Sequence, residues 1–270
     1  MQIITAILYN PNVKGFFSGK IYTGELKSVC VPGLNCYSCP GAVGACPIGA
    51  LQAVIGSLRN RISLYVAGFL IFTGALLGRF ICGWACPFGL IQELLYKIPT
   101  RKIKARRLFG YLKYLKYAIL VIFVIAIPII LLLLNGVSDP AFCSFICPAG
   151  TLEAGIPLVL LNKSLQSLLG WLFSWKVFLL VVTIVLSVVI YRPFCRFICP
   201  LGAIYSFFNR ISVFGIELDK SKCTNCAACA HSCKMDINPC KNQNDPECIR
   251  CGDCIKACKA GALKYRTIIK

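Results

Sequence analysis

Two runs of cysteines near the end of the chain share one spacing. CTNCAACAHSC begins at Cys223 and CIRCGDCIKAC begins at Cys248, and both read C-x2-C-x2-C-x3-C. In this spacing three thiolates hold one [4Fe-4S] cluster, and the fourth thiolate ligates a second cluster. The spacing therefore predicts one cluster at Cys223, Cys226, Cys229 and Cys258, and another at Cys248, Cys251, Cys254 and Cys233.

Zinc is the alternative metal for paired C-x2-C units, but zinc takes four ligands from two separated pairs, whereas each run here supplies four close cysteines. The region instead resembles the bacterial two-cluster ferredoxins, down to its ending CIKACKAGAL. Lys234 and Lys259 stand where that family carries proline after the fourth cysteine. Since a nearby cation favours the reduced cluster, we expect both lysines to raise the reduction potentials.

Two residues close to these runs have less specific roles. Cys240 is the odd thiol of the region, and we expect a buried structural cysteine there rather than a ligand. His231 is the only histidine and is expected at the domain surface, so the chain cannot form a bis-histidine haem site. No C-x-x-C-H is present for covalent haem attachment, and no haem is predicted.

A second cysteine pattern, C-P-x-G, occurs four times in the first 211 residues. The four copies are ACPIGALQ (45–52), ACPFGLIQ (85–92), ICPAGTLE (146–153) and ICPLGAIY (198–205). Another cysteine lies four residues upstream in the last three copies, which gives the pairs Cys82/Cys86, Cys143/Cys147 and Cys195/Cys199. In the first copy that position is Ala42, and Cys36 and Cys39 lie nearby.

Proline after cysteine suits the first turn of a helix and keeps the cysteine extended. The thiolate then lies at a helix N-terminus, where free N–H groups stabilise negative charge. Such a position suits an iron–sulfur ligand and a reactive thiol equally well. Buried or paired structural thiols are the third interpretation, because C-x3-C-P alone does not specify a metal.

The composition places these motifs in a membrane protein. Hydrophobic residues make up 57% of the 270 residues and charged residues 14%, and the mean hydropathy is +0.73. Three apolar stretches are candidate spans: Ile62 to Gly78, Tyr117 to Leu134 with a kink at Pro128, and Val177 to Tyr191, extendable back to Trp171. The net charge of +19 accompanies no nucleic-acid-binding module, so nucleic acid is not a predicted partner.

The basic residues predict the orientation, because basic loops stay on the cytoplasmic side. Those between the first two spans are Arg79, Lys97, Arg101, Lys102, Lys104, Arg106, Arg107, Lys113 and Lys116, against Glu93 alone. We therefore expect an all-α transmembrane domain (1–211) of three to four spans with short re-entrant or interfacial helices at the C-P-x-G copies. A small α+β ferredoxin domain (212–270) would follow on the cytoplasmic side; a fourth span would move the N-terminus.

This topology sorts the membrane cysteines into two sets. The inner set is Cys82, Cys86, Cys195 and Cys199, the number that one cluster needs. The outer set is Cys30, Cys36, Cys39, Cys46, Cys143 and Cys147, from which Cys36, Cys39, Cys46, Cys143 and Cys147 are the candidate ligands. The copies alternate between sides, as in inverted-repeat membrane proteins. One or two further iron–sulfur clusters are predicted if these thiols hold metal.

The whole pattern resembles the membrane-bound 4Fe-4S proteins of the NapH type. RFICGWACPFG (79–89), RPFCRFICPLG (192–202) and both ferredoxin runs carry the resemblance. It implies electron transfer to or from an extracytoplasmic redox system, often together with other subunits. The chain adds the outer cysteines and lacks the flavin domain of larger relatives, so the resemblance leaves the acceptor open.

We therefore expect an integral-membrane electron carrier or oxidoreductase subunit. Its donor would be a cytoplasmic ferredoxin or flavoprotein, and its acceptor an extracytoplasmic reductase or a quinone. Two other functions stay open: a transmembrane thiol–disulfide reductant that uses the C-x3-C-P dithiols, and a quinol-oxidising subunit. About 8 iron atoms per chain would favour thiol chemistry, whereas about 12 or more would indicate clusters at the membrane cysteines.

Overall fold

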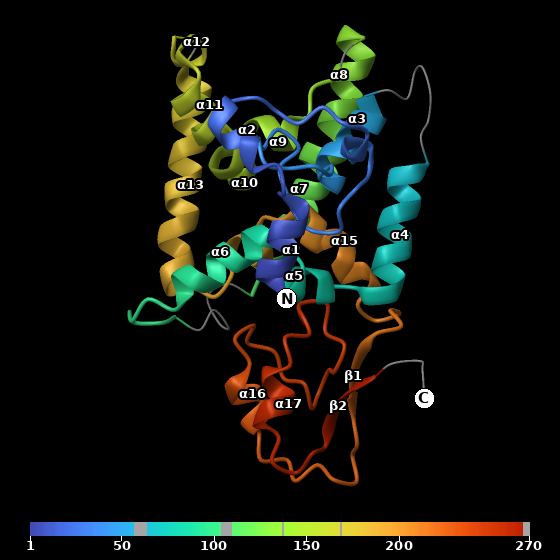
Figure 1. Ribbon diagram of the computed structural model, residues 1–270. Helices are drawn as coiled ribbons and strands as arrows, with labels where there is room; N and C mark the ends of the chain where they lie inside the picture. Colours follow the sequence, from blue (N-terminus) through green and yellow to red (C-terminus); the bar gives the residue numbers. More distant parts are fainter. Residues whose placement is uncertain (57–63, 104–109, 137, 168, 267–270) are drawn as a thin grey trace.

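The computed structural model describes residues 1–56, 64–103, 110–136, 138–167 and 169–266 (Figure 1). Its first helices are α1 (Gln2–Tyr9), α2 (Val13–Ser18), η1 (Glu25–Ser28), α3 (Pro47–Gly56), α4 (Tyr65–Leu77), α5 (Phe80–Trp84), α6 (Pro87–Tyr96), η2 (Leu112–Tyr114), α7 (Leu115–Ile119), η3 (Leu120–Ala126) and α8 (Ile127–Asn135). They are followed by α9 (Ala141–Phe145), α10 (Pro148–Gly150), η4 (Thr151–Gly155), α11 (Ile156–Leu161), α12 (Lys163–Gln166), α13 (Trp171–Val189), α14 (Pro193–Phe197) and α15 (Pro200–Phe208).

Two of the three predicted spans correspond to helices long and apolar enough to cross a membrane, Leu112–Asn135 and Trp171–Val189. Only 22% and 17% of their apolar windows are buried, whereas the core helix of a soluble protein is mostly buried. The remaining predicted span is Ile62 to Gly78, and its first two residues lie outside the described residues. Its described part contains the 13-residue helix α4. We expect a kink at Pro128, which lies in the first turn of α8, and the segment directly before that helix, η3, is π-helical.

Each C-P-x-G copy begins a helix at its proline, as predicted. These helices are α3, α6, α10 and α15, and the cysteine before each proline ends the preceding loop. In the last three copies the upstream cysteine lies on a five-residue helix, α5, α9 or α14. Every such copy is therefore a helix, a break and a second helix, with one cysteine on the first helix and one at the break.

The last part of the chain is a small unit of two strands and two short helices. β1 (Gly215–Leu218) pairs antiparallel with β2 (Leu263–Arg266), with Gly215 opposite Arg266. The helices α16 (Ala228–Ser232) and α17 (Asp253–Ala257) carry the two cysteine runs between the strands. In Figure 1 this unit, coloured orange to red, lies below the helical part, beside α5 and α6.

The ferredoxin-like unit lies on the side of the predicted basic loop. Arg79 and Lys116, the first and last basic residues of that segment, both pair with Glu247 of the unit, at 2.7 and 2.5 Å. α2, α3, α9 and α12 lie at the opposite end of the helical part (Figure 1). The fold therefore separates one end that carries the ferredoxin-like unit from another that carries the first and third C-P-x-G copies.

Candidate metal centres

Three thiols of the first ferredoxin run and the last thiol of the second form a group that we call the distal site: Cys223, Cys226, Cys229 and Cys258. All four line one small cavity, together with Cys240. They are the residues whose spacing predicts a single cluster. Cys226 is exposed, so the distal site lies at the protein surface.

Cys240 is closer to this site than the sequence indicates. Its Sγ lies 3.2 Å from Cys229 Sγ and 4.0 Å from Cys223 Sγ, and its side chain is half-buried. The cysteine is therefore in contact with two candidate ligands. Its distance from the motif along the sequence gives no signal of this contact, because the loop that carries Cys240 folds back onto α16.

The second run forms the proximal site, which consists of Cys233, Cys248, Cys251 and Cys254. These four thiols line a second small cavity with Met235 and Ile249. Each cavity is therefore lined by three cysteines of one run and one of the other. Lys234 pairs with Asp253 at 2.9 Å, so a carboxylate offsets part of the positive charge beside this site.

The thiols of the ferredoxin-like unit differ in their electrostatics. Burial raises the pKa of Cys248 to about 11, whereas a backbone N–H from Ala228 lowers the pKa of the exposed Cys226. A buried thiol becomes a thiolate when a cation replaces its proton. The proximal site therefore favours a bound positive centre, such as iron, over free thiolates.

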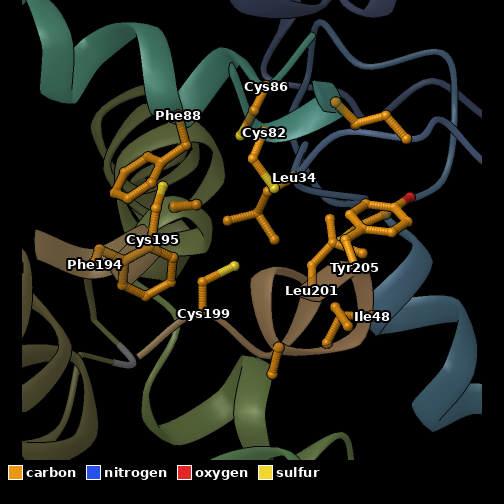
Figure 2. Close-up of a cluster of buried hydrophobic side chains, with 14 of the residues drawn as sticks. Leu34, Ile48, Cys82, Cys86, Phe88, Phe194, Cys195, Cys199, Leu201 and Tyr205 are labelled. Carbon is orange, nitrogen blue, oxygen red and sulfur yellow. The ribbon is translucent and has the colours of Figure 1, made fainter. Parts of the chain in front are cut away.

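The inner site is Cys82, Cys86, Cys195 and Cys199, all buried. The four cysteines surround Leu34, and Phe88 and Phe194 lie beside Cys195 (Figure 2). The sequence folds this way because Cys86 and Cys199 cap the helices α6 and α15. The backbone N–H of Gly89 donates to Cys86 Sγ and that of Gly202 donates to Cys199 Sγ, each with a nitrogen–sulfur distance of 3.4 Å.

Two buried arginines lie next to the inner site. Arg192 donates to the carbonyl oxygens of Cys82 and Gly83, and Arg79 donates to the carbonyl oxygen of Cys195 at 3.2 Å. Both side chains are fully buried. Four thiolates around a cluster would bring negative charge into an apolar interior, and these guanidinium groups supply positive charge there, part of which Glu93 and Glu247 offset.

The outer site is Cys36, Cys46, Cys143 and Cys147, which line a cavity of about 1050 Å³. Cys46 and Cys147 come from the first and third copies, Cys143 lies on α9, and Cys36 replaces the upstream cysteine that the first copy lacks. Cys39, also predicted as a ligand, is buried but does not line this cavity. Cys30 is likewise buried elsewhere, beside Ala45.

The donor chemistry of these four sites fits iron–sulfur clusters better than single ions. Among the described residues, no three His, Cys, Asp or Glu side chains converge closely enough to hold one metal ion. A four-iron cluster spreads its thiolates over four metal atoms, so its ligands lie farther apart. Such a cluster requires four thiols from different turns of the chain, and backbone N–H groups that donate to the sulfur atoms stabilise it.

The ferredoxin-like unit is fixed against the inner site by buried polar contacts. Glu247 is 7% exposed, and although burial alone raises its pKa, the charges of Arg79 and Lys116 outweigh that effect and hold the pKa below the usual range. Trp84 Nε1 donates to the carbonyl oxygen of Arg250 at 3.0 Å. A Cβ at Gly83 would lie 2.4 Å from the carbonyl oxygen of Ile249, so only glycine permits this contact.

One loop runs between the inner and outer sites. Leu34 lies among the four inner cysteines (Figure 2) and also lines the cavity of the outer site. A Cβ at the preceding Gly33 would lie 3.3 Å from the Cα of Cys86, and Cys36, an outer thiol, follows two residues after Leu34. The segment from Gly33 to Cys36 therefore contacts both groups of thiols.

Sequence reasoning missed most of the residues that join these sites. The glutamine that ends ACPIGALQ and ACPFGLIQ was visible in the repeats as a shared residue, yet only the fold shows what it contacts. Glu247 and Arg79 carry no local signal, because they lie 168 residues apart in the chain.

Comparisons with known proteins agree with this arrangement. A family described as a 4Fe-4S binding domain matches residues 44–65, 62–106, 117–160 and 168–218, and each matched segment contains one C-P-x-G copy. An uncharacterised protein of Methanocaldococcus jannaschii is 30% identical over 80% of this chain and 74% of its own length. No solved structure matches.

Two named relatives are similar over much of the chain. The ferredoxin-type protein NapH of Haemophilus influenzae is 26% identical over 78% of this chain and 70% of its own length. The regulatory protein NosR of Stutzerimonas stutzeri is 32% identical over 68% of this chain, which is 24% of NosR. The chain therefore belongs to the 4Fe-4S binding domain family and is a polyferredoxin-like 4Fe-4S protein of the NapH type.

Proposed function

We propose that this protein conducts electrons across a membrane along the distal, proximal, inner and outer sites, each of which holds one [4Fe-4S] cluster. When bound, such a cluster supplies reversible one-electron chemistry. The chain holds the thiolates in place, keeps water away from the inner site and fixes the order of the sites. The ferredoxin-like unit faces the cytoplasm in this proposal, because it packs against the ends of the basic segment.

The loop between the inner and outer sites is the observation that carries this proposal. An apolar core of about 30 Å is too thick for a single electron step, so a carrier needs centres inside the membrane domain. Leu34 lies among the four inner thiols (Figure 2) and also lines the cavity of the four outer thiols.

The junction between the proximal and inner sites supports the same order. Met235 and Ile249, which line the proximal site, belong to the buried core that contains Cys82 and Cys195. Glu247, directly before the ligand Cys248, is held by two buried cations of the helical part. The proximal site is therefore attached to the inner site by buried packing and ion pairs, and electron transfer between the two sites would need no domain movement.

The surface around the distal site indicates the chemistry of the donor. Lys220, Lys222, Lys256 and Lys259 are exposed on the segments that carry the distal cysteines. Positive charge beside an exposed redox site attracts partners with acidic surfaces and speeds their encounter. We therefore propose an acidic cytoplasmic donor, such as a ferredoxin or a flavoprotein, with an extracytoplasmic reductase or a quinone as the acceptor.

Iron analysis after oxygen-free purification tests the proposal directly. Four clusters predict about 16 iron atoms per chain, and the loss of any one cluster removes about four. Cys199→Ser and Cys147→Ser should each lower the iron content by about four atoms. Cys39→Ser is the matched control, a buried thiol outside all four sites, and should leave the iron content unchanged.

A wild-type iron content of about 8 would overturn the membrane clusters and favour the thiol–disulfide function. One observation favours that second candidate: the outer cavity is far larger than a cluster needs, and its Cys36 and Cys143 are only partly buried. A disulfide-bearing substrate could then reach the outer thiols. Reduction of the clusters by quinol in liposomes would instead support the quinol-oxidising alternative.

A further inference from the structure

Gln92 connects two C-P-x-G copies at the inner site. It lies on α6, is 1% exposed, and its Nε2 donates to Cys195 Sγ at 3.1 Å. Its Oε1 accepts a hydrogen bond from the backbone N–H of Phe194 at 3.2 Å. The second copy therefore holds the first cysteine of the fourth copy through two hydrogen bonds, one to the sulfur of Cys195 and one from the backbone N–H of Phe194.

Gln52 makes the same contacts at the outer site. It lies on α3, is 2% exposed, and its Nε2 donates to Cys143 Sγ at 3.3 Å. Its Oε1 accepts from the backbone N–H of Phe142 at 3.0 Å. The first copy therefore binds the third copy through the same two hydrogen bonds by which the second copy binds the fourth. The copies thus form two pairs, the first with the third and the second with the fourth.

The orientation of both amides follows from their partners. A backbone N–H can only donate, so the oxygen of each glutamine must face Phe142 or Phe194, and the nitrogen must face sulfur. Both glutamines occupy the sixth position after the cysteine of their copy. In the third copy that position is Glu153, whose Oε2 accepts from the backbone N–H of Cys36 at 2.6 Å, so the carboxylate meets a donor and not a sulfur.

We propose that Gln52 and Gln92 are positioning residues that set the reduction potentials of the outer and inner clusters separately, by donating an amide N–H to one cluster thiolate each. This inference rests on the proposed function, because it requires metal-bound thiolates at both sites. A hydrogen bond to a ligand sulfur offsets negative charge, which favours the reduced cluster and raises its potential. Glutamine is required because glutamate has no N–H to donate and would add a negative charge.

The test is a redox titration of the whole purified protein, followed by electron paramagnetic resonance, with Gln92→Glu and Gln52→Glu. Glutamate keeps the shape and the oxygen that holds the phenylalanine N–H, but it loses the donor to sulfur and to the carbonyl oxygen of Phe88 or Ile48, and it adds a negative charge. Gln92→Met and Gln52→Met lose the donor without adding charge, so they separate the two effects. Each variant should lower the midpoint potential of one centre by at least about 59 mV, a tenfold change for one electron, and leave the other centres unchanged. Gln166→Met, on the exposed α12, is the control and should shift none.

Iron content separates the two possible failures. About 16 iron atoms in the wild type and in both variants, with no shift in any potential, would overturn the role of the glutamines and leave the proposed function intact. About 8 iron atoms in the wild type would overturn the proposed function and this inference together. A glutamate variant that loses about four iron atoms has lost its cluster, and the methionine variants then replace it. Gln92→Met and Gln52→Met have an uncharged side chain without the N–H donor. A midpoint potential equal to wild type in these variants would again refute the tuning role.

Discussion

Glu247 offers the sharpest test of how the ferredoxin-like unit is attached. Its carboxylate pairs with Arg79 and Lys116, whose side chains are 0% exposed, and its own side chain is 10% exposed. Glu247→Gln keeps the shape but leaves two buried cations without their counter-charge. Removal of one partner from a buried ion pair costs about 3–5 kcal/mol, which is about a 10²- to 10⁴-fold change in the docking equilibrium.

Hydrogen–deuterium exchange measures this equilibrium directly. The amides of Val213 and Phe214 donate to the carbonyl oxygens of Ala75 and Leu76 on the helical part, and they exchange when the unit leaves it. Glu247→Gln should therefore speed their exchange by about 10²- to 10⁴-fold. Glu217→Gln is the matched control, because Glu217 lies in the same unit but is 53% exposed and 3.9 Å from Lys264. An exposed pair contributes about 0.2–1 kcal/mol. Equal exchange in both variants would show that the buried pair does not hold the unit in place.

The attachment should also depend on pH. The pKa of Glu247 lies below its ordinary value of 4.5, so docking is fully stabilised above that pH and weakens as the pH falls below it, measured by the same exchange. Gly33→Ala should slow electron transfer to the outer site in stopped-flow absorbance while iron content stays unchanged, because a Cβ there would lie 2.7 Å from a backbone oxygen. Lys259→Pro should lower the midpoint potential of one ferredoxin-like centre, and an unchanged titration would reject the charge argument. Cys240→Ala should lower the potential of the distal centre without loss of iron, because the thiol lies 3.2 Å from Cys229 Sγ; loss of about four iron atoms would instead make Cys240 a ligand.

The sequence predicts the local features of this fold well, because they depend on neighbouring residues. Proline after cysteine begins a helix in all four copies, and the apolar stretches that end near Leu134 and Tyr191 correspond to the long helices. The exchange of Cys233 and Cys258 between the ferredoxin runs also follows from spacing alone, and the two cavities show the same grouping.

The sequence does not reveal which distant residues meet. The outer set offered more thiols than one cluster needs, and only the fold selects Cys36 over Cys39, because the loop after Leu34 turns the first of them into the cavity. Cys240 carries no spacing signal, since its contact with Cys229 depends on how a loop closes. Such contacts are made between segments far apart in the chain, where sequence periodicity carries no information.

The pairing of copies explains why this chain uses a repeated motif in a membrane. In the proposed function one C-x3-C-P copy supplies two thiols at a helix break, which is half of a cluster site, and Cys36 stands in for the upstream thiol that the first copy lacks. A second copy completes the site, and the glutamine of one copy holds the first cysteine of the other, as Gln92 holds Cys195. In the proposed function two such pairs, which meet at Leu34, extend the cluster sites of the ferredoxin-like unit into the membrane domain. Loss of one glutamine donor should therefore change the potential of a single centre, whereas loss of the connecting loop should interrupt electron transfer between centres that keep their own potentials.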